Sequence, residues 1–438
     1  MKAVIILFFA IANLLFYSNE LFSQNIRILN LDEAISIAKK NNSELMIVRI
    51  EKLKAEEKIS EVYSENLVPT ITLNSRYTRS FKKQVIEIFG QKFEIGSDNS
   101  IINTFDITEP IPVLGTPVFS GIRIAEYYSK IQDENINFVE NNVRTNVKKA
   151  FFTVLLMKEV IEVNSSSLLN AEENLRVVDV RYKAGVAMEF DYLRAKVKVE
   201  TLKPNLKQSE NNLVLSQKLL KNTLGIRTDE VIDAAGRLTF DSTELIGSSD
   251  NIIKKVINEN VSVRQLKINK LINDELIRVD RSNFMPKIYL FGQYSLQAFE
   301  NDGRALTKYR FFNSISAGVG LTWDLNFFRH GYKENQSILE SKKTEEQIID
   351  VKEKLKTQSE SVLLKIDDAK NRIAAQIETI KQAERGLELA NISFKSGVLN
   401  QIDVLDAELT LSQVKLGYLQ AVYDYLIART ELEQLLEK

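Results

Sequence analysis

The absence of helix breakers over two long stretches constrains this fold more than any other feature of the sequence. No glycine or proline lies within Ile122–Ala184 or within Tyr332–Arg385, and the chain of 438 residues has only 16 glycines and 6 prolines. Breaker-free segments with helical periodicity predict uninterrupted helices. At 1.5 Å per residue the first helix would be on the order of 95 Å long, far beyond the usual length of helices in globular domains.

Two segments beside these stretches resemble each other. Arg181–Ala195 (RYKAGVAMEFDYLRA) aligns without gaps with Ser393–Ala407 (SFKSGVLNQIDVLDA). In each segment a glycine ends one helical pattern, and a carboxylate lies near the start of the next. Each segment is therefore predicted to be the tip of a helical hairpin. The aligned identities are Lys183/Lys395, Gly185/Gly397, Val186/Val398, Asp191/Asp403, Leu193/Leu405 and Ala195/Ala407.

Alternating segments indicate two pairs of strands. Val68–Tyr77 alternates apolar and polar side chains, and Thr104–Thr108 alternates again after a polar loop around Gly90–Asn99, which predicts one hairpin. In the second half, Ser282–Tyr294 matches the first strand, and Ser314–Leu325 alternates most clearly of all. Both halves of the chain therefore have the same order of elements, which indicates an internal repeat.

The other segments are predicted as helices. Leu31–Asn66 and Asn251–Asn283 are charged and amphipathic, and Phe190–Leu224 follows the first tip with Pro204 inside it. Apolar residues spaced by threes and fours near the C-terminus predict coiled-coil packing. The predicted organisation is a signal peptide at 1–23, a first repeat at 24–225, a linker at 226–250 and a second repeat at 251–438.

The N-terminus has the pattern of a secretory signal. Lys2 precedes an apolar run from Val4 to Tyr17, and the small residue Ser23 precedes Gln24, so cleavage after Ser23 is predicted. A short anchor helix is the alternative interpretation of the same run. The chain has no cysteine, which excludes disulfides, thiolate metal sites and lipidation of an N-terminal cysteine.

Composition argues against several classes of function. The 58 lysines and arginines nearly balance the 59 aspartates and glutamates, so no nucleic-acid footprint is indicated. The single histidine, His330, has no partner at metal or triad spacing and is expected at the surface, next to Gly331 at a strand-to-helix junction. With no phosphate-binding glycine loop either, the sequence predicts no enzyme, no cofactor and no metal site.

Four strands in a chain pose a problem of closure. A barrel in a membrane needs about eight or more strands and no free edge, because unpaired backbone groups in hydrocarbon cost several kcal/mol each. Three chains of four strands would supply twelve. The prediction is an α+β membrane protein, with a trimeric 12-stranded β-barrel continuous with a barrel of twelve helices. The alternative is a hairpin packed on helices in water.

The order of elements and the two tips resemble the TolC-like outer membrane efflux protein (OEP) family over essentially the whole mature chain. GVLNQIDVLDA (Gly397–Ala407) resembles the second tip of that family, GVAMEFD (Gly185–Asp191) its first, and PVFSG (Pro117–Gly121) its return from barrel to helix. The resemblance implies a homotrimeric channel-tunnel in the outer-membrane lipid, with its helical part in the periplasm. It also implies a periplasmic adaptor and an inner-membrane transporter of RND or ABC type, the channel being a passive conduit.

The resemblance also assigns the mouth of the pore. The pore-narrowing aspartates of the family match Asp403 and Asp406, and the acid of its first tip matches Asp191. Phe394 stands where the family has a hydroxyl-bearing aromatic, and Leu399 where it has an arginine, so the usual latch cannot form. We hypothesise that Arg194 replaces it by pairing with an aspartate across a helix interface.

Two further interpretations concern the tips. The resemblance assigns Gly185, Val186, Gly397, Val398 and Leu399 to docking of the adaptor, although the glycines also suit left-handed turn geometry. Each carboxylate at a third helical position, Asp403 with Asn400 above all, could instead complete a capping box.

One rival class remains at the level of sequence. A periplasmic coiled-coil scaffold or adaptor without a pore would share the helical pattern, but it would extract without detergent. Within the channel class, small-molecule efflux and type I protein secretion use the same kind of conduit, and the sequence is compatible with both.

Overall fold

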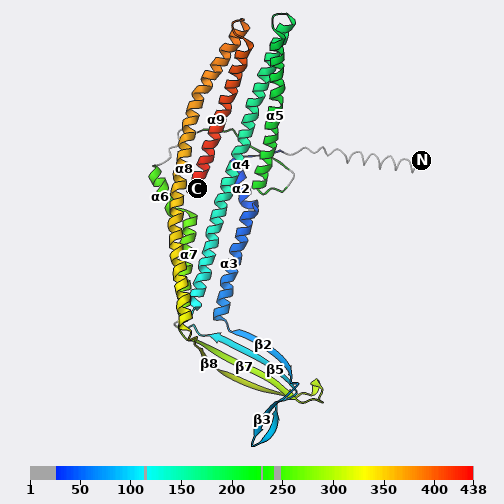
Figure 1. Ribbon diagram of the computed structural model, residues 1–438, viewed down its shortest axis with the longest axis vertical. Coiled ribbons are helices and arrows are strands. Elements are labelled where there is room, and N and C mark those ends of the chain that lie inside the picture. Colours follow the sequence, from blue (N-terminus) through cyan, green and yellow to red (C-terminus); the bar gives the residue numbers. More distant parts are fainter. Residues whose placement is uncertain (1–25, 113–115, 228–229, 241–247, 438) are drawn as a thin grey trace, which may run out of the picture. The chain divides into compact units, whose positions relative to one another are not determined.

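The computed structural model describes residues 26–112, 116–227, 230–240 and 248–437; the expected signal peptide lies outside the described residues. The chain is mostly helical (Figure 1). The helices are α2 (Leu31–Asn41), α3 (Ser43–Leu67), α4 (Val118–Lys183), α5 (Glu189–Thr223), α6 (Ser249–Glu259), α7 (Val261–Ser282), α8 (Phe327–Lys395) and α9 (Gln401–Leu435), with a 3-10 turn at Leu306–Lys308. The strands are β1 (Ile26–Leu29), β2 (Thr70–Arg79), β3 (Gln84–Ile88), β4 (Gln91–Ile95), β5 (Asn99–Pro110), β6 (Val231–Ala234), β7 (Lys287–Glu300) and β8 (Phe311–Thr322).

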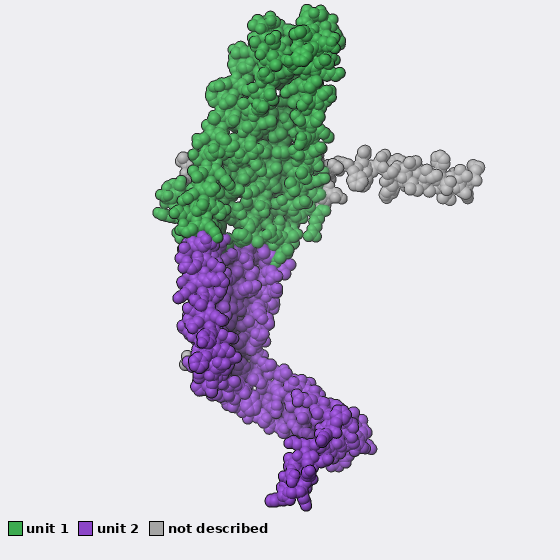
Figure 2. Space-filling model, in the orientation of Figure 1, with its two compact units in different colours: residues 1–47, 137–261, 353–438 green, residues 48–136, 262–352 purple. Residues whose placement is uncertain are grey.

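The chain divides into two compact units (Figure 2). The first contains residues 1–47, 137–261 and 353–438, and the second contains 48–136 and 262–352. The described part of the first unit holds both tips, and the second holds the larger sheet.

The two long helices are confirmed. α4 has 66 residues and α8 has 69, so each is on the order of 100 Å long. In the first unit α4 packs on α9, where the hydroxyls of Ser167 and Ser412 are 2.5 Å apart, and on α5, where Asn164 donates to Ser209 at 2.7 Å. α5 continues through Pro204. The expected side-by-side packing of long helices is thus present within one chain.

The two shorter charged helices that we expected, Leu31–Asn66 and Asn251–Asn283, are each broken in two, so those predictions were wrong in their continuity. Asn42 separates α2 from α3, and Asn260 separates α6 from α7; both have extended backbone, with ψ of 126° and 136°. The side chain of Asn42 accepts from the N–H groups of Glu44 and Leu45 at 2.9 and 3.2 Å. Asparagine satisfies freed backbone groups in this way, and helical periodicity alone does not reveal such a break.

A four-stranded antiparallel sheet has the order β2-β5-β7-β8. Near the middle of the sheet, its register places apolar and polar residues in separate rows that cross all four strands. One apolar row is Leu73–Phe105–Tyr294–Ile315, and the neighbouring polar row is Asn74–Thr104–Ser295–Ser314. The two faces of the sheet therefore differ in chemistry, as the alternation predicted. In the single chain β2 and β8 are edge strands.

The connection between β2 and β5 is not the polar loop that we expected around Gly90–Asn99. It contains a second, separate hairpin formed by β3 and β4, and Asn99 already belongs to β5. Phe89 and Gly90 at its turn both have positive φ, 51° and 75°, as in a type I′ turn. The dipeptide Phe-Gly is a weak turn signal, which explains why the hairpin was missed.

The start of α8 corrects two expectations. β8 ends at Thr322 rather than Leu325, and His330 is buried, with 4% of its surface exposed, instead of lying at the surface. Its ring packs edge-on against Phe284, with centroids 5.6 Å apart, and its Nε2 lies 3.4 Å from a carboxylate oxygen of Asp324 without hydrogen-bond geometry. His330 lies near the start of α8, which begins at Phe327, and Phe284 lies just after α7, which ends at Ser282. The contact between the two rings therefore joins the ends of these helices.

A small parallel sheet lies in the first unit. β1 pairs with β6, which falls inside the segment 226–250 that we expected to be a linker. Asp233 on β6 accepts a hydrogen bond from Lys158 on α4 at 2.8 Å and from Gln217 on α5 at 3.1 Å. This part of the segment is thus tied to the helices.

Candidate functional site

The first tip joins α4 to α5 through a turn closed by its backbone. The N–H of Gly185 donates to the carbonyl of Tyr182, and that of Val186 to the carbonyl of Arg181, both at 3.0 Å. This pair of bonds is a Schellman motif. Gly185 has φ of 73°, so the left-handed geometry that the glycine suggested is present. The rings of Tyr182 and Tyr192 stack across the hairpin with centroids 5.4 Å apart.

The second tip repeats this closure between α8 and α9. Gly397 has φ of 80°, its N–H donates to the carbonyl of Phe394 at 3.1 Å, and the N–H of Val398 donates to that of Ser393 at 2.9 Å. The internal similarity in sequence therefore corresponds to the same local structure.

The two tips differ at the start of the following helix. Asn400 and Asp403 form a capping box, in which the N–H of Asn400 donates to Asp403 Oδ2 at 3.0 Å. Met188 precedes α5 and makes no side-chain cap, so Asp191 has no such partner. The capping interpretation is confirmed for Asp403 and does not hold for Asp191.

The candidate gate carboxylates lie on two helices. Asp403 and Asp406 are one turn apart on α9, the first half-buried and the second exposed, while Asp191 is half-buried on α5. Among the described residues, no hydrogen bond or ion pair joins Asp191 to either of them. The structure therefore shows no direct bond between Asp191 and the carboxylates of the second tip.

The candidate docking residues form the exposed ends of the tips. Val186 and Val398 are 75% and 78% exposed, and Met188 in the same turn is 70% exposed. Leu399 is less open, at 36%. Apolar side chains this exposed on a rigid turn are typical of surfaces that contact another protein. Met188 was not among the residues that we expected to dock.

Among the residues that the structure describes, Arg194 contacts no aspartate. Its guanidinium lies over the ring of Phe190, 4.5 Å from the centroid. No ion pair of Arg194 occurs in the described part of the chain, so its proposed partner would have to come from another copy.

Arg181 makes the contact between tips that the sequence did not predict. From the end of α4 its Nη2 donates to the carbonyls of Phe394 and Lys395 at 3.2 Å each, and its guanidinium lies 4.5 Å from the centroid of the Phe394 ring. The cation thus occupies the C-terminal end of α8, where the helix dipole favours positive charge. The sequence signal was an arginine in the first tip where the second has Ser393.

A second polar contact lies next to it. Gln401, at the start of α9, is 4% exposed, and its Nε2 donates to Asn174 Oδ1 on α4 at 3.4 Å. The second tip is therefore held to α4 at two levels, by Arg181 and by Asn174.

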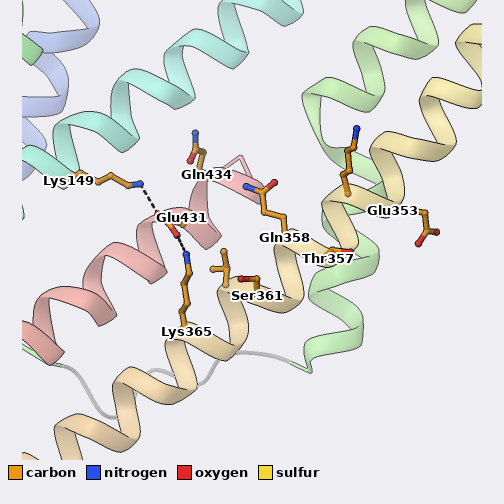
Figure 3. A pocket seen from close by; sticks show the side chains of 10 residues that line it. Lys149, Glu353, Thr357, Gln358, Ser361, Lys365, Glu431 and Gln434 are labelled. Atoms are coloured by element: carbon orange, nitrogen blue, oxygen red, sulfur yellow. Dashed lines mark hydrogen bonds and ion pairs between the residues drawn. The ribbon is translucent and has the colours of Figure 1, made fainter.

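Far from the tips, a groove of about 710 Å³ lies along α8 beside α4 and α9. Lys149 and Lys365 both point at the carboxylate of Glu431, at 2.9 and 3.3 Å (Figure 3). Burial opposes the charge on Glu431, but these two lysines outweigh it, so the pKa of the carboxyl lies below its usual value. This ion triplet joins three helices, α4, α8 and α9.

None of the helices that the structure describes has an apolar stretch long enough to cross a membrane. Within the same described ranges, no three histidine or carboxylate side chains are placed to share a metal ion.

Two helical hairpins with glycine tips and a sheet with one apolar and one polar face are the arrangement expected of an outer-membrane channel protein. The chain matches the family described as "Outer membrane efflux protein" over residues 34–226 and 252–437, and it belongs to that family. Members of this family are channel proteins of the outer membrane and not enzymes.

Individual relatives agree with this assignment. The "Outer membrane protein TolC" of Escherichia coli (strain K12) is 23% identical over 93% of this chain and 82% of the relative. In fold, the outer-membrane channel OprN has a TM-score of 0.76 at 13% identity, covering 93% of this chain and 89% of that one. The outer membrane protein VceC of Vibrio cholerae has a TM-score of 0.74 at 13% identity, covering 93% and 96%.

Proposed function

We propose that this protein is the outer-membrane channel-tunnel of a tripartite export system, either efflux or type I secretion, and that it works as a homotrimer. The observation that carries the trimer is the four-stranded sheet, in which the apolar row Leu73–Phe105–Tyr294–Ile315 and the neighbouring polar row Asn74–Thr104–Ser295–Ser314 reach both edge strands. Three copies would close it as twelve strands, with the apolar rows toward lipid and the polar rows toward a water-filled lumen.

The helical part then lies in the periplasm as a barrel of twelve helices. The exposed apolar turns at Gly185–Val186 and Gly397–Leu399 dock a periplasmic adaptor. An inner-membrane transporter of RND or ABC type supplies the energy, and the channel is a passive conduit. In the same proposal the chain is organised as a signal peptide at 1–23, repeats at 24–225 and 251–438, and a connecting segment at 226–250.

The gate of this channel is formed by the carboxylates of the second tip. Threefold symmetry gathers six carboxylates from Asp403 and Asp406 around the mouth, with Asp191 beside them, and such rings favour cations. Arg194 pairs with an aspartate of the neighbouring copy, for which it must leave the ring of Phe190.

Oligomeric state and conductance test the channel itself. The mature protein should need detergent for extraction, have the mass of three chains by light scattering, and open steady pores in planar bilayers. Extraction without detergent, or a trimer that never conducts, would support the pore-free scaffold instead.

Block by trivalent cations tests the gate. The parent channel should be blocked from the periplasmic side, and the double variant Asp403→Asn/Asp406→Asn should lose this block. Asp367→Asn/Asp368→Asn on α8 is the matched control, because it removes two carboxylates away from the tips. Equal block of both double variants would sink the assignment. For Arg194→Ala, unchanged conductance and unchanged export would remove that residue from the gate.

Charge placed on the docking turns tests the contact with the adaptor. Val398→Glu should abolish toxin resistance in cells while conductance in bilayers stays normal. Val214→Glu, at another exposed valine on α5, should leave both unchanged. Full resistance of the Val398→Glu strain would contradict docking at this turn.

A further inference from the structure

A second cavity, of about 310 Å³, lies in the helical wall of the first unit and is separate from the groove of Figure 3. α4 lines it from Glu159 to Asn170, α9 lines it from Glu408 to Leu419, and α8 contributes Ile380 and Leu387. Its volume is at the lower end of the range for small-molecule sites, which begins at about 300 Å³.

One side of this cavity is hydrocarbon. Val163, Ile380, Leu387 and Leu411 come from three different helices and are each half-buried in the chain. Such a surface would accept the apolar body of a ligand, because its contact with water is unfavourable.

Some of the charged side chains around the cavity have ion-pair partners among the described residues, and one carboxylate does not. Lys415 is paired with Glu384 at 2.9 Å. Glu159 and Glu162 both lie beside Arg237, at 3.8 and 3.2 Å. Glu408 is the one lining carboxylate for which no hydrogen bond or ion pair occurs in the described part of the chain.

Glu408 is also poorly hydrated. Burial raises the pKa of this carboxyl to about 7, and the positive charge of Lys198 on α5 opposes the shift only in part. A half-buried carboxylate without a counter-ion gains most from a cation that brings its own apolar surroundings.

We propose that this cavity binds a monocationic amphiphile, a protonated or quaternary amine on an apolar body, with the Glu408 carboxylate as its counter-ion. The hydrocarbon of Val163, Ile380, Leu387 and Leu411 holds the apolar body. This site goes beyond the export function, since binding to the wall requires neither the gate at the tips nor any partner protein.

Direct binding of a dye to the purified full-length protein tests the site. The probe is rhodamine 6G, a lipophilic monocation, followed by fluorescence anisotropy in a neutral detergent at pH 8. Rhodamine B, a zwitterion with a similar ring system, is the control ligand. The parent should bind rhodamine 6G at least tenfold more tightly than rhodamine B.

Two variants separate charge from shape. Glu408→Gln keeps the size of the side chain and should weaken rhodamine 6G at least tenfold. Leu387→Trp keeps the charge, fills the cavity and should weaken it as well. Glu388→Gln, an exposed carboxylate on α8 that pairs with Arg385, should bind like the parent.

The pH dependence gives an independent readout. The ionised fraction of a carboxyl with a pKa of about 7 falls about tenfold between pH 8 and pH 6, so the affinity of the parent should fall by the same factor. Glu408→Gln should lack this dependence. The other titratable and charged groups around the cavity are Glu159, Glu162, Lys198, Arg237, Glu384, Lys415 and Tyr418.

Equal affinity of the parent and Glu408→Gln for rhodamine 6G overturns the proposal, whether the cavity stays empty or a second copy of the chain fills it. Because the assay measures binding and not conductance, failure here leaves the channel function untouched. A channel that fails to conduct leaves this site untouched in turn.

Discussion

Replacing Arg181 by alanine should loosen the second tip from α4. The guanidinium makes two hydrogen bonds to the last carbonyls of α8, at 3.2 Å each, and covers the ring of Phe394. Because the two hydrogen bonds are long and the guanidinium is partly exposed, together they stabilise the closed position of the tip by about 1.5 kcal/mol. The contact with the ring adds about 0.5 kcal/mol. A loss of about 2 kcal/mol raises the population of the loosened tip by about 30-fold.

Hydrogen exchange measures this population directly. Peptides that cover Ser393–Asn400 should exchange faster in Arg181→Ala by up to that factor, since exchange follows the open population when closing is fast. Peptides from the first tip serve as an internal reference. Arg176→Ala is the matched control, because it removes from the same helix a cation that pairs with a neighbour on that helix, Glu173.

Two results would refute this reasoning. If the second tip exchanged alike in Arg181→Ala and Arg176→Ala, the contact would contribute nothing to holding the tip. If both tips exchanged faster to the same extent, the substitution would destabilise the whole helical unit. Arg181→Lys should fall between the parent and alanine, because an ammonium keeps the charge at the helix end but loses the planar fork.

Three further predictions concern stability in detergent, measured by thermal unfolding followed by circular dichroism. Glu408→Gln should stabilise the protein by about 1 to 2 kcal/mol at pH 8 and by nothing below pH 4.5. Because burial raises the pKa of the Glu408 carboxyl to about 7, ionising it in the folded protein costs free energy that grows as the pH rises from 4.5 to 7. The upper limit of this cost is about 3 kcal/mol, and solvent screening of the partly exposed carboxylate lowers it. Gly225→Ala should destabilise the protein more than Gly397→Ala. Both glycines have positive φ, where an alanine costs about 1 kcal/mol. At Gly225 the added Cβ would also lie 2.5 Å from a backbone oxygen, whereas at Gly397 it would meet no atom within 4 Å. Asp403→Asn should cost about 0.5 to 1 kcal/mol and Asp191→Asn almost nothing, since only Asp403 completes a capping box; equal losses in either pair would contradict these assignments.

The regular parts of this fold could be predicted because they depend on local sequence periodicity. The long stretches without breakers became α4 and α8, and the tip glycines took positive φ at 73° and 80°. Alternation along the strands fixed which residues share a face, so the apolar row from Leu73 to Ile315 follows from the pattern once the strands pair.

The parts that sequence missed depend on single side chains. Asn42 and Asn260 end helices whose periodicity continues on both sides of the break. Their positions correspond in the two repeats, which a comparison of the halves could have found. The hairpin of β3 and β4 was hidden because Phe89 adopts a left-handed conformation that glycine or asparagine usually occupies.

At the candidate site, the sequence identified the tips but not the contacts between them. The motif drew attention to Arg194. Among the described residues, its guanidinium contacts the ring of Phe190 on its own helix and nothing on the second tip. Arg181 lies ten positions before Asp191 and has no partner in its own hairpin that a spacing rule would reveal. Its partners, the carbonyls of Phe394 and Lys395, belong to the other repeat, and only the packing of α4 beside α8 brings them into reach.

The two tips are therefore held in different ways. The first tip is closed across its own hairpin by the stacked rings of Tyr182 on α4 and Tyr192 on α5. The second is held from outside, by Arg181 and Asn174 of α4. The bonds of Arg181 and Asn174 join the two hairpins, so moving the second tip away from α4 breaks them while the backbone closure of each tip stays intact. The second tip carries Asp403 and Asp406, so such a movement would also shift the carboxylates of the proposed gate.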